Sequence, residues 1–263
     1  MKKVIVLITI VLSCVSFTTQ AQDTIRIMTF NIDQGVEASL QRIGEIIQSY
    51  NPDFVAVQEV DIYPHRSYAV HQHDKNFIAE LSYYADMQGV FGKAWDHPQG
   101  WDFGDAILSK HSFTKSETFA LPHIVNTEPR QMVLIHTSVK GHPICFASTH
   151  LSHESKTLRA MQIRKIKQIM KKQKETIQFV CGDFNSDLLE GLVLSILKYW
   201  KDALPKEEGT FSSNPEWQFK AHKYDYILYN AQKKKNIEVL NATIKCDVEL
   251  TDHCIGIVDI IIP

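Results

Sequence analysis

The sequence predicts an α/β protein, and three observations support that fold class. Short apolar runs typical of strands alternate with segments whose apolar residues recur every three or four positions. The chain has no internal repeat, low-complexity tract or long linker. Its composition, 44% hydrophobic and 22% charged residues, is that of a globular protein and excludes a disordered or fibrous one. We therefore expect residues 22–263 to form one domain.

The expected strands are short, and each contains a hydrophobic run bounded by polar residues, proline or glycine. In chain order they cover residues 25–32, 53–58, 106–109, 132–139, 143–149, 176–181, 225–229 and 254–262.

Amphipathic helices are expected between several of these strands. Apolar residues recur at every third or fourth position after Val36, and Asn51-Pro52 ends that segment. Asp74 stands close to the start of the next apolar segment and is expected to cap that helix. The predicted helices cover residues 36–49, 76–84, 156–174 and 188–200.

The first residues have the features of a signal for export. Two lysines are followed by an apolar run over 4–12, which is too short to cross a bilayer as a helix. A small-residue stretch then leads to Ala21, so residues 1–21 are predicted to be a cleaved signal peptide. Lipid attachment at Cys14 is the alternative, and a retained anchor is a third. No later segment is long and apolar enough to cross a membrane.

The charge balance argues against non-specific nucleic-acid binding. The whole chain has a net charge of −2, and without residues 1–21 it has 26 basic and 30 acidic side chains, a net charge of −4. Binding to nucleic acid regardless of sequence depends on lysines and arginines that displace counterions from phosphates.

Export would make disulfides possible. Cys145 and Cys181 lie within expected strands and are predicted to be buried thiols. Cys246 and Cys254 are eight residues apart across a possible hairpin, and the sequence leaves open whether they pair. The absence of a C-x-x-C spacing argues against a structural zinc site.

Polar residues follow the apolar runs at the ends of five expected strands. Carboxylates seldom occupy such positions unless they are paired, hydrogen-bonded or bound to metal. Carboxylate and amide oxygens suit Mg²⁺ or Mn²⁺, and neighbouring histidines suit phosphate contact and proton transfer. The pattern therefore predicts one shared site, formed by Asn31, Glu59, His150, Asp183, Asn185, Asp252 and His253.

These motifs resemble those of the exonuclease–endonuclease–phosphatase superfamily. The most specific are PDFVAVQEVD, GDAILSK, STHL, GDFNS and TDH, in family order along the chain. The resemblance is strongest to the exported bacterial branch of metal-dependent hydrolases. It implies a four-layer α/β/β/α sandwich, with two mixed β-sheets flanked by helices. The matching stretches are residues 27–32, 52–61, 104–110, 128–130, 148–151, 182–186, 225–227 and 251–253.

The resemblance also implies a divalent metal, Mg²⁺ or Mn²⁺. Glu59 would be its main ligand, with Asn31 beside it. Asp252 would add a second carboxylate on the metal side.

Five residues are implied to act on the phosphoester. Asp183 would orient or deprotonate the attacking water, and Asn185 would hold the phosphate. His253, oriented by Asp225, would contact the scissile phosphate. His150 would stabilise the phosphate or the leaving oxygen.

Four further residues are candidates for substrate contact. Arg66 and Arg130 stand where this branch often has arginine and can grip a phosphate; a surface ion pair is the alternative for each. Asp105 replaces an asparagine common in relatives, so it either adds negative charge near the phosphate or forms a turn. Trp101 can stack on a substrate ring or pack in the core.

The leading functional hypothesis is an exported, metal-dependent phosphodiesterase acting on a small-molecule or lipid-derived diester. An extracellular or periplasmic nuclease is the alternative, with nucleic acid as the substrate. A non-catalytic binding protein on the same fold is the third hypothesis, and the presence of Glu59, Asp183 and His253 argues against it. The protein is expected to act as a monomer.

Overall fold

The computed structural model describes residues 23–187, 191, 195, 200–206, 208–211, 222–230 and 237–262. The predicted signal peptide lies outside these residues, as does most of the predicted helix 188–200.

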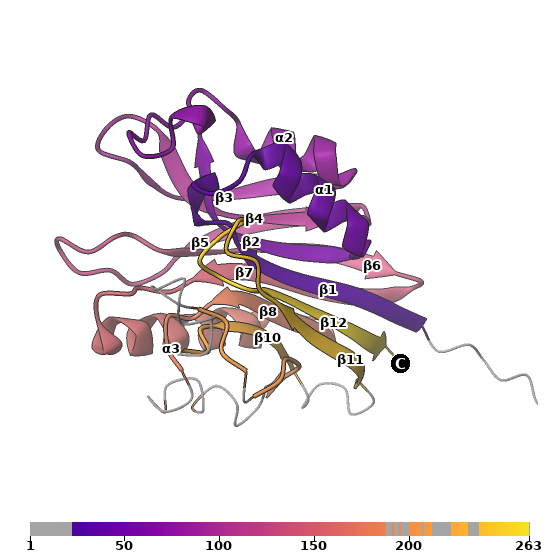
Figure 1. Cartoon of the computed structure of the whole chain (residues 1–263). Helices are drawn as coiled ribbons and strands as arrows, with labels where there is room; N and C mark the ends of the chain where they lie inside the picture. Colours follow the sequence, from indigo (N-terminus) through magenta and orange to yellow (C-terminus); the bar gives the residue numbers. More distant parts are fainter. Residues whose placement is uncertain are drawn as a thin grey trace, which may run out of the picture.

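Two mixed six-stranded sheets face each other, with helices on their outer sides (Figure 1). The first sheet, sheet A, has the strand order β11-β12-β1-β2-β4-β3, and the second, sheet B, has the order β5-β6-β7-β8-β10-β9. The predicted four-layer sandwich is confirmed. The strands of sheet A are β1 (Asp23–Asn31), β2 (Phe54–Ile62), β3 (Gln88–Asp96), β4 (Asp102–Ser109), β11 (Glu238–Lys245) and β12 (Ile255–Ile262). Those of sheet B are β5 (Phe113–Ala120), β6 (Gln131–Val139), β7 (His142–His150), β8 (Ile177–Asp183), β9 (Lys201–Asp202) and β10 (Asp225–Tyr229).

Three apolar clusters hold these layers together. The cluster between the sheets includes Phe54 from sheet A and Phe146 from sheet B, whose rings stack at 5.1 Å. The other two fill the outer faces, where α1 (Leu40–Tyr50) and α2 (Phe77–Ala85) cover sheet A and α3 (Lys156–Lys172) covers sheet B. None of the helices in the described part of the chain is long and apolar enough to cross a membrane.

The first two helices begin later than predicted, for local reasons. Val36, the predicted start of the first helix, instead ends a 3-10 turn over Asp33–Gly35, and its N–H donates to the Asp33 carbonyl oxygen at 2.9 Å. Ser39 caps α1 by accepting a hydrogen bond from the Arg42 N–H at 3.2 Å. The prediction that Asp74 caps α2 was wrong, because the Asn76 side chain accepts the hydrogen bond from the Ala79 N–H.

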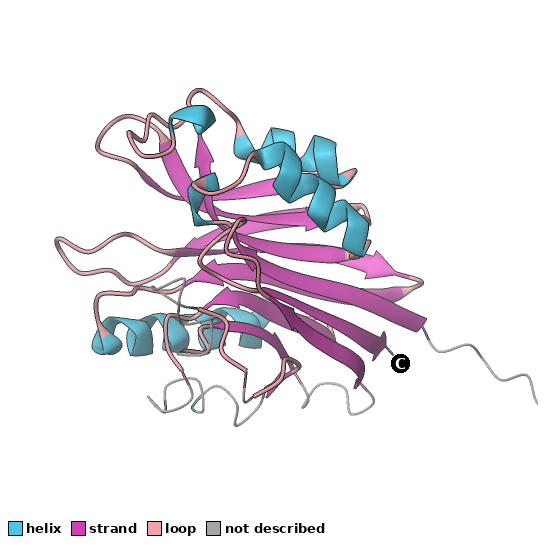
Figure 2. Cartoon of the chain, in the orientation of Figure 1, coloured by secondary structure: helices cyan, strands magenta, loops and turns pink. Residues whose placement is uncertain are grey.

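Strand direction brings the predicted site to one end of the sandwich. β1 and β2 are parallel in sheet A, and β7 and β8 are parallel in sheet B, so their carboxyl ends lie at one edge of each sheet. Beneath that edge, the buried Gln58 side chain donates to Ser148 Oγ at 3.1 Å and joins the two sheets. Figure 2 shows long loops gathered at the end of the sheets away from the labelled C-terminus.

Candidate active site

The ends of both sheets surround a cleft of about 260 Å³. Glu59 comes from β2, His150 ends β7 and Asp183 ends β8. Asp225 opens β10 directly opposite Asp183, and His253 lies just before β12. Of the predicted catalytic and metal-binding residues, Glu59, His150, Asp183, Asn185, Asp252 and His253 line the cleft. Asn31 and Asp225 contact these residues from behind.

Glu59 points into the cleft because β2 bulges at this position. The pairing of β2 with β4 shifts between Val57 and Val60, and Glu59 has a φ of +61°. A bulge of this kind re-aims a side chain that strand alternation would direct elsewhere. Asn31 donates through Nδ2 to Glu59 Oε1 at 3.0 Å and to Asp183 Oδ2 at 3.2 Å, so it joins the two sheets behind the cleft.

Three carboxyl groups on the sheet A side interact through their charges. We call Asp33, Glu59 and Asp252 the acidic group. Burial, together with the charges of Glu59 and Asp252, raises the pKa of Asp33 to about 8. Burial raises the pKa of Glu59 against the hydrogen bond from Asn31, and burial raises the pKa of Asp252. Closely placed carboxylates that resist ionisation fit a divalent cation, since its charge would relieve the desolvation and the repulsion.

Asp33 was not among the residues predicted for the site. It follows Asn31 by two positions at the end of an expected strand, which is the same signal that identified the other members. Its backbone N–H donates to Asn31 Oδ1 at 3.1 Å, and this turn brings its carboxyl group toward Glu59.

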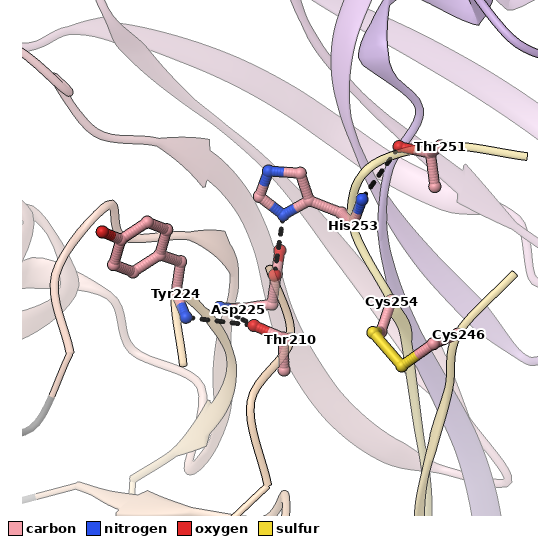
Figure 3. The surroundings of a disulfide bond; sticks show 7 residues. All are labelled: Thr210, Tyr224, Asp225, Cys246, Thr251, His253 and Cys254. Atoms are coloured by element: carbon pink, nitrogen blue, oxygen red, sulfur yellow. Dashed lines mark hydrogen bonds and ion pairs between the residues drawn. A yellow bond between two sulfur atoms is a disulfide. The ribbon is translucent and has the colours of Figure 1, made fainter. Parts of the chain in front are cut away.

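The second set of site residues is built around imidazoles, and we call His150, Asp183, Asp225 and His253 the histidine group. His253 Nδ1 donates to Asp225 Oδ2 at 2.9 Å, as Figure 3 shows. Burial alone would lower the pKa of His253, but the carboxylates of Asp225 and Asp183 raise it to about 10. Atoms of Asp183, Asp225 and His253 that could bind a metal lie within 4.8 Å of one another.

His150 lies among hydrogen-bond donors and remains neutral. Arg130 Nη1 donates to its Nδ1 at 3.0 Å, so the hydrogen of the neutral ring is on Nε2, which lies 3.3 Å from Asp183 Oδ2 and 2.9 Å from Asn185 Nδ2. Burial lowers the pKa of His150 well below its usual value, and the charges of Arg130 and His253 add to the effect. The Asn185 Nδ2 group donates to the Leu151 carbonyl oxygen at 2.9 Å, and this bond fixes the orientation of its amide.

A disulfide lies directly behind His253. Cys246 and Cys254 are bonded, which resolves the pairing that the sequence left open. Because Cys254 follows His253, the bond closes the loop that carries both Asp252 and His253 (Figure 3). The buried Thr251 hydroxyl donates to the Asn31 carbonyl at 3.0 Å and ties the same loop to β1.

The sequence comparison identifies the family. Residues 28–253 match the model of the Endonuclease/Exonuclease/phosphatase family. The chain belongs to this family. It is accordingly a hydrolase of phosphoester bonds. A comparison with curated protein sequences finds no significant match.

Solved structures of this family have the same fold. An endonuclease/exonuclease/phosphatase from Beutenbergia cavernae is 19% identical, with a TM-score of 0.72 over 91% of this chain and 72% of its own. A mannosyl-6-phosphatase from Bacteroides thetaiotaomicron is 14% identical, with a TM-score of 0.69 over 90% and 100% of the two chains. The catalytic domain of human Nocturnin is 21% identical, with a TM-score of 0.64 over 91% and 97%.

The four residues predicted for substrate contact occupy different positions in this family member. Arg130 is 4% exposed in the cleft wall and pairs with Glu128 at 2.8 Å. Arg66 also lines the cleft. Its guanidinium donates two hydrogen bonds to the Asp61 carboxylate, at 2.6 and 3.1 Å. Trp101 is buried and stacks on His97, a cleft residue, at 3.8 Å.

Asp105 lies within a strand, so the alternative of a turn was wrong. It is in β4, buried, and its Oδ2 accepts a hydrogen bond from Gln131 Nε2 at 3.0 Å. Burial raises its pKa to about 8, although the charge of Arg130 lowers it.

Proposed function

We propose that the protein is an exported, divalent-metal-dependent phosphodiesterase that hydrolyses a small-molecule or lipid-derived diester by in-line attack of water. The observation that carries this proposal is that members of both groups line one cleft: Glu59 and Asp252 of the acidic group, and His150, Asp183 and His253 of the histidine group. The first set supplies cation ligands and the second supplies groups that hold phosphate and move protons.

Glu59, Asn31 and Asp252 would hold the metal, with Asp33 beside them. Their oxygens are the ligands that Mg²⁺ and Mn²⁺ prefer. When bound, such an ion neutralises charge on the phosphate oxygens.

The chain's own residues would then act on the substrate. Asp183 would accept the proton of the attacking water, and its pKa, raised by burial, suits a base near neutral pH. His253, positively charged because of Asp225, would stabilise a non-bridging phosphate oxygen. Asn185 and Arg130 would donate hydrogen bonds to the phosphate, and the neutral His150 would act at the leaving oxygen.

The disulfide supports the proposal of export, since such bonds persist mainly in oxidising compartments. Residues 1–21 would direct export and be removed, with lipid attachment at Cys14 as the alternative.

A phosphomonoester is a second candidate substrate. The cleft volume of about 260 Å³ suits one phosphate and a small organic group. The mannosyl-6-phosphatase of the same fold supports this candidate. An extracellular or periplasmic nuclease is the alternative activity, since the sequence motifs fit it as well.

The deciding experiment is hydrolysis by the purified protein, without its predicted leader, in Mg²⁺ or Mn²⁺. The substrates are bis-p-nitrophenyl phosphate, p-nitrophenyl phosphate, a hexose 6-phosphate, sphingomyelin, plasmid DNA and RNA. We expect diester cleavage that a chelator abolishes while the circular dichroism spectrum is retained. A His253→Ala preparation controls for contaminating enzymes. Preferential cleavage of monoesters or nucleic acid would replace the proposed substrate, and activity in chelator would refute the metal.

A further inference from the structure

Both carboxylate oxygens of Glu59 accept hydrogen bonds from side chains. Asn31 donates to Oε1 at 3.0 Å, and Gln34 Nε2 donates to Oε2. Asn31 belongs to the predicted metal site, whereas Gln34 has none of the roles described above. Two such contacts fix the rotamer of a carboxylate and leave lone pairs on both oxygens for a cation.

Gln34 is itself held by a chain of hydrogen bonds that begins on β2. Asp61, which is fully buried, accepts two hydrogen bonds from Arg66, at 2.6 and 3.1 Å. Arg66 Nη1 donates to Tyr68 Oη at 2.7 Å, and Tyr68 Oη donates to Gln34 Oε1 at 2.8 Å. The chain therefore starts and ends on the same strand, at Asp61 and Glu59.

The chemistry of this chain permits one orientation of the Gln34 amide. An arginine can only donate, so the Tyr68 oxygen accepts from Arg66 and its hydroxyl hydrogen is available for Gln34. The Glu59 carboxylate can only accept, so Gln34 turns its NH₂ group to Glu59 and its carbonyl oxygen to the hydroxyl hydrogen of Tyr68. The ring of Trp101, 5.2 Å from the guanidinium carbon, helps to hold Arg66 in place.

The backbone around Gln34 is also constrained. Gln34 has φ +52° and ψ +16°, a left-handed conformation that is unfavourable for a residue other than glycine. The following residue, Gly35, accepts hydrogen bonds on its carbonyl oxygen from His71 and Gln72, each at 2.9 Å. The loop that carries Arg66 and Tyr68 therefore also clamps the turn that carries Gln34.

We propose that Gln34 is a positioning residue for Glu59, and that Tyr68, held by Arg66, orients the Gln34 amide. The inference rests on the proposed function, because it takes Glu59 as a metal ligand. Arg66 therefore supports the metal ligand Glu59 through Tyr68 and Gln34, in addition to lining the cleft.

The test measures binding of Mn²⁺ alone, by the electron paramagnetic resonance signal of the free ion, with no substrate present. Loss of a residue that supports a metal ligand typically weakens binding by ~10–100-fold. We expect Gln34→Ala to weaken Mn²⁺ binding by about tenfold or more and Tyr68→Phe by a smaller factor. Tyr63→Phe is the matched control, an exposed tyrosine near the same loop that takes no part in the chain, and we expect it to bind Mn²⁺ normally.

A double variant separates this role from a general structural one. Because Tyr68 acts through Gln34, the variant with both Gln34→Ala and Tyr68→Phe should bind Mn²⁺ no more weakly than Gln34→Ala alone. Melting temperatures of all variants show whether each is folded. Unchanged Mn²⁺ affinity in folded Gln34→Ala overturns the inference, as does additive weakening in the double variant.

Glu59→Gln distinguishes failure of this inference from failure of the proposed function. If Glu59→Gln binds Mn²⁺ as tightly as the unaltered protein does, Glu59 is not a metal ligand. Both the metal assignment and the role proposed for Gln34 are then wrong. If Glu59→Gln loses Mn²⁺ and Gln34→Ala does not, the metal assignment stands and Gln34 is excluded as a positioning residue. A raised KM with unchanged Mn²⁺ affinity would make Gln34 a substrate contact instead.

Discussion

The acidic group and the histidine group contain similar carboxyl groups in different surroundings. Partial burial raises the pKa values of Asp33, Glu59 and Asp252, and the charges of Glu59 and Asp252 raise that of Asp33 further. Asp225 is paired with the imidazole of His253 at 2.9 Å, and its carboxylate stabilises the positive charge of that imidazole. The acidic group consists of carboxyl groups alone, whereas the histidine group contains the cationic His253. On the proposed function, the cleft separates metal binding from phosphate chemistry, so each can be disrupted without the other.

The largest expected effect comes from breaking the histidine group. We expect His253→Ala to lower kcat by ~10²–10⁴-fold, because the variant loses the cation that is proposed to stabilise the phosphate. Its Mn²⁺ affinity should change little, since the acidic group remains. Steady-state kinetics on bis-p-nitrophenyl phosphate and a separate Mn²⁺ titration check the two statements. His123→Ala, an exposed histidine in a loop, is the control. A loss of Mn²⁺ binding equal to the loss of kcat would show that the two groups act as one.

The converse change breaks the acidic group. We expect Glu59→Gln to raise the Mg²⁺ concentration needed for half-maximal activity by at least ~10²-fold, more than the loss of a supporting residue alone. Activity should recover in part at high Mg²⁺, because the histidine group is intact. A Mg²⁺ titration of activity measures this. An unchanged requirement for Mg²⁺ would contradict the assignment of Glu59 as the main ligand.

Much of the fold was predictable because the central strands are buried on both faces. β10 was predicted with its exact bounds, since a continuous apolar run marks a buried strand. The strands that the sequence did not predict are β3, β5, β9 and β11, which form the four sheet edges in the described structure. Edge strands are exposed on one side, and β5 accordingly has mostly exposed or half-buried polar residues with little alternation.

The site shows a similar division. Residues at the ends of buried strands, such as Asp183 and His150, were predictable because polar residues stand out after apolar runs. Contacts that depend on irregular backbone were not. The bulge that aims Glu59 and the left-handed turn at Gln34 have no signature in the sequence, because neither contains glycine at the decisive position.

The disulfide offers a milder way to disturb the histidine group. Replacing Cys246 and Cys254 together by serine should lower the free energy of unfolding by ~2–4 kcal/mol, as for disulfides in general. Activity should fall by about tenfold, less than the ~10²-fold that a displacement of 1 Å can cost, because Thr251 still ties the loop to β1. Chemical denaturation and kinetics measure the two effects.

A reductant provides the control for this double variant. It should reproduce both effects in the unaltered protein and leave the serine variant unchanged, since both proteins retain Cys145 and Cys181. Full activity after reduction would show that the loop holds Asp252 and His253 without the covalent bond.

The smallest expected effect is the pH dependence of stability in the metal-free protein. A carboxyl group with a raised pKa keeps its proton in the folded state when the unfolded chain has released it, so the free energy of unfolding falls as pH rises. For Asp33 this window runs from its ordinary pKa of 3.8 to about 8. The contribution of His253 is complete below its ordinary pKa of 6.5 and is lost as pH rises through about 10. Both shifts have the same sign, so in chelator the melting temperature should decrease between pH 6 and pH 9, by about 2–4 °C for each kcal/mol lost.

Mg²⁺ should raise the melting temperature more at pH 9 than at pH 6, because the cation replaces the protons of the acidic group. Asp33→Asn removes one carboxyl group and should flatten the pH dependence in chelator. A melting temperature that rises with pH would contradict this prediction. So would a pH dependence of the melting temperature that is the same in Asp33→Asn as in the unaltered protein. Either result would mean that ionisation of the acidic group does not destabilise the metal-free protein.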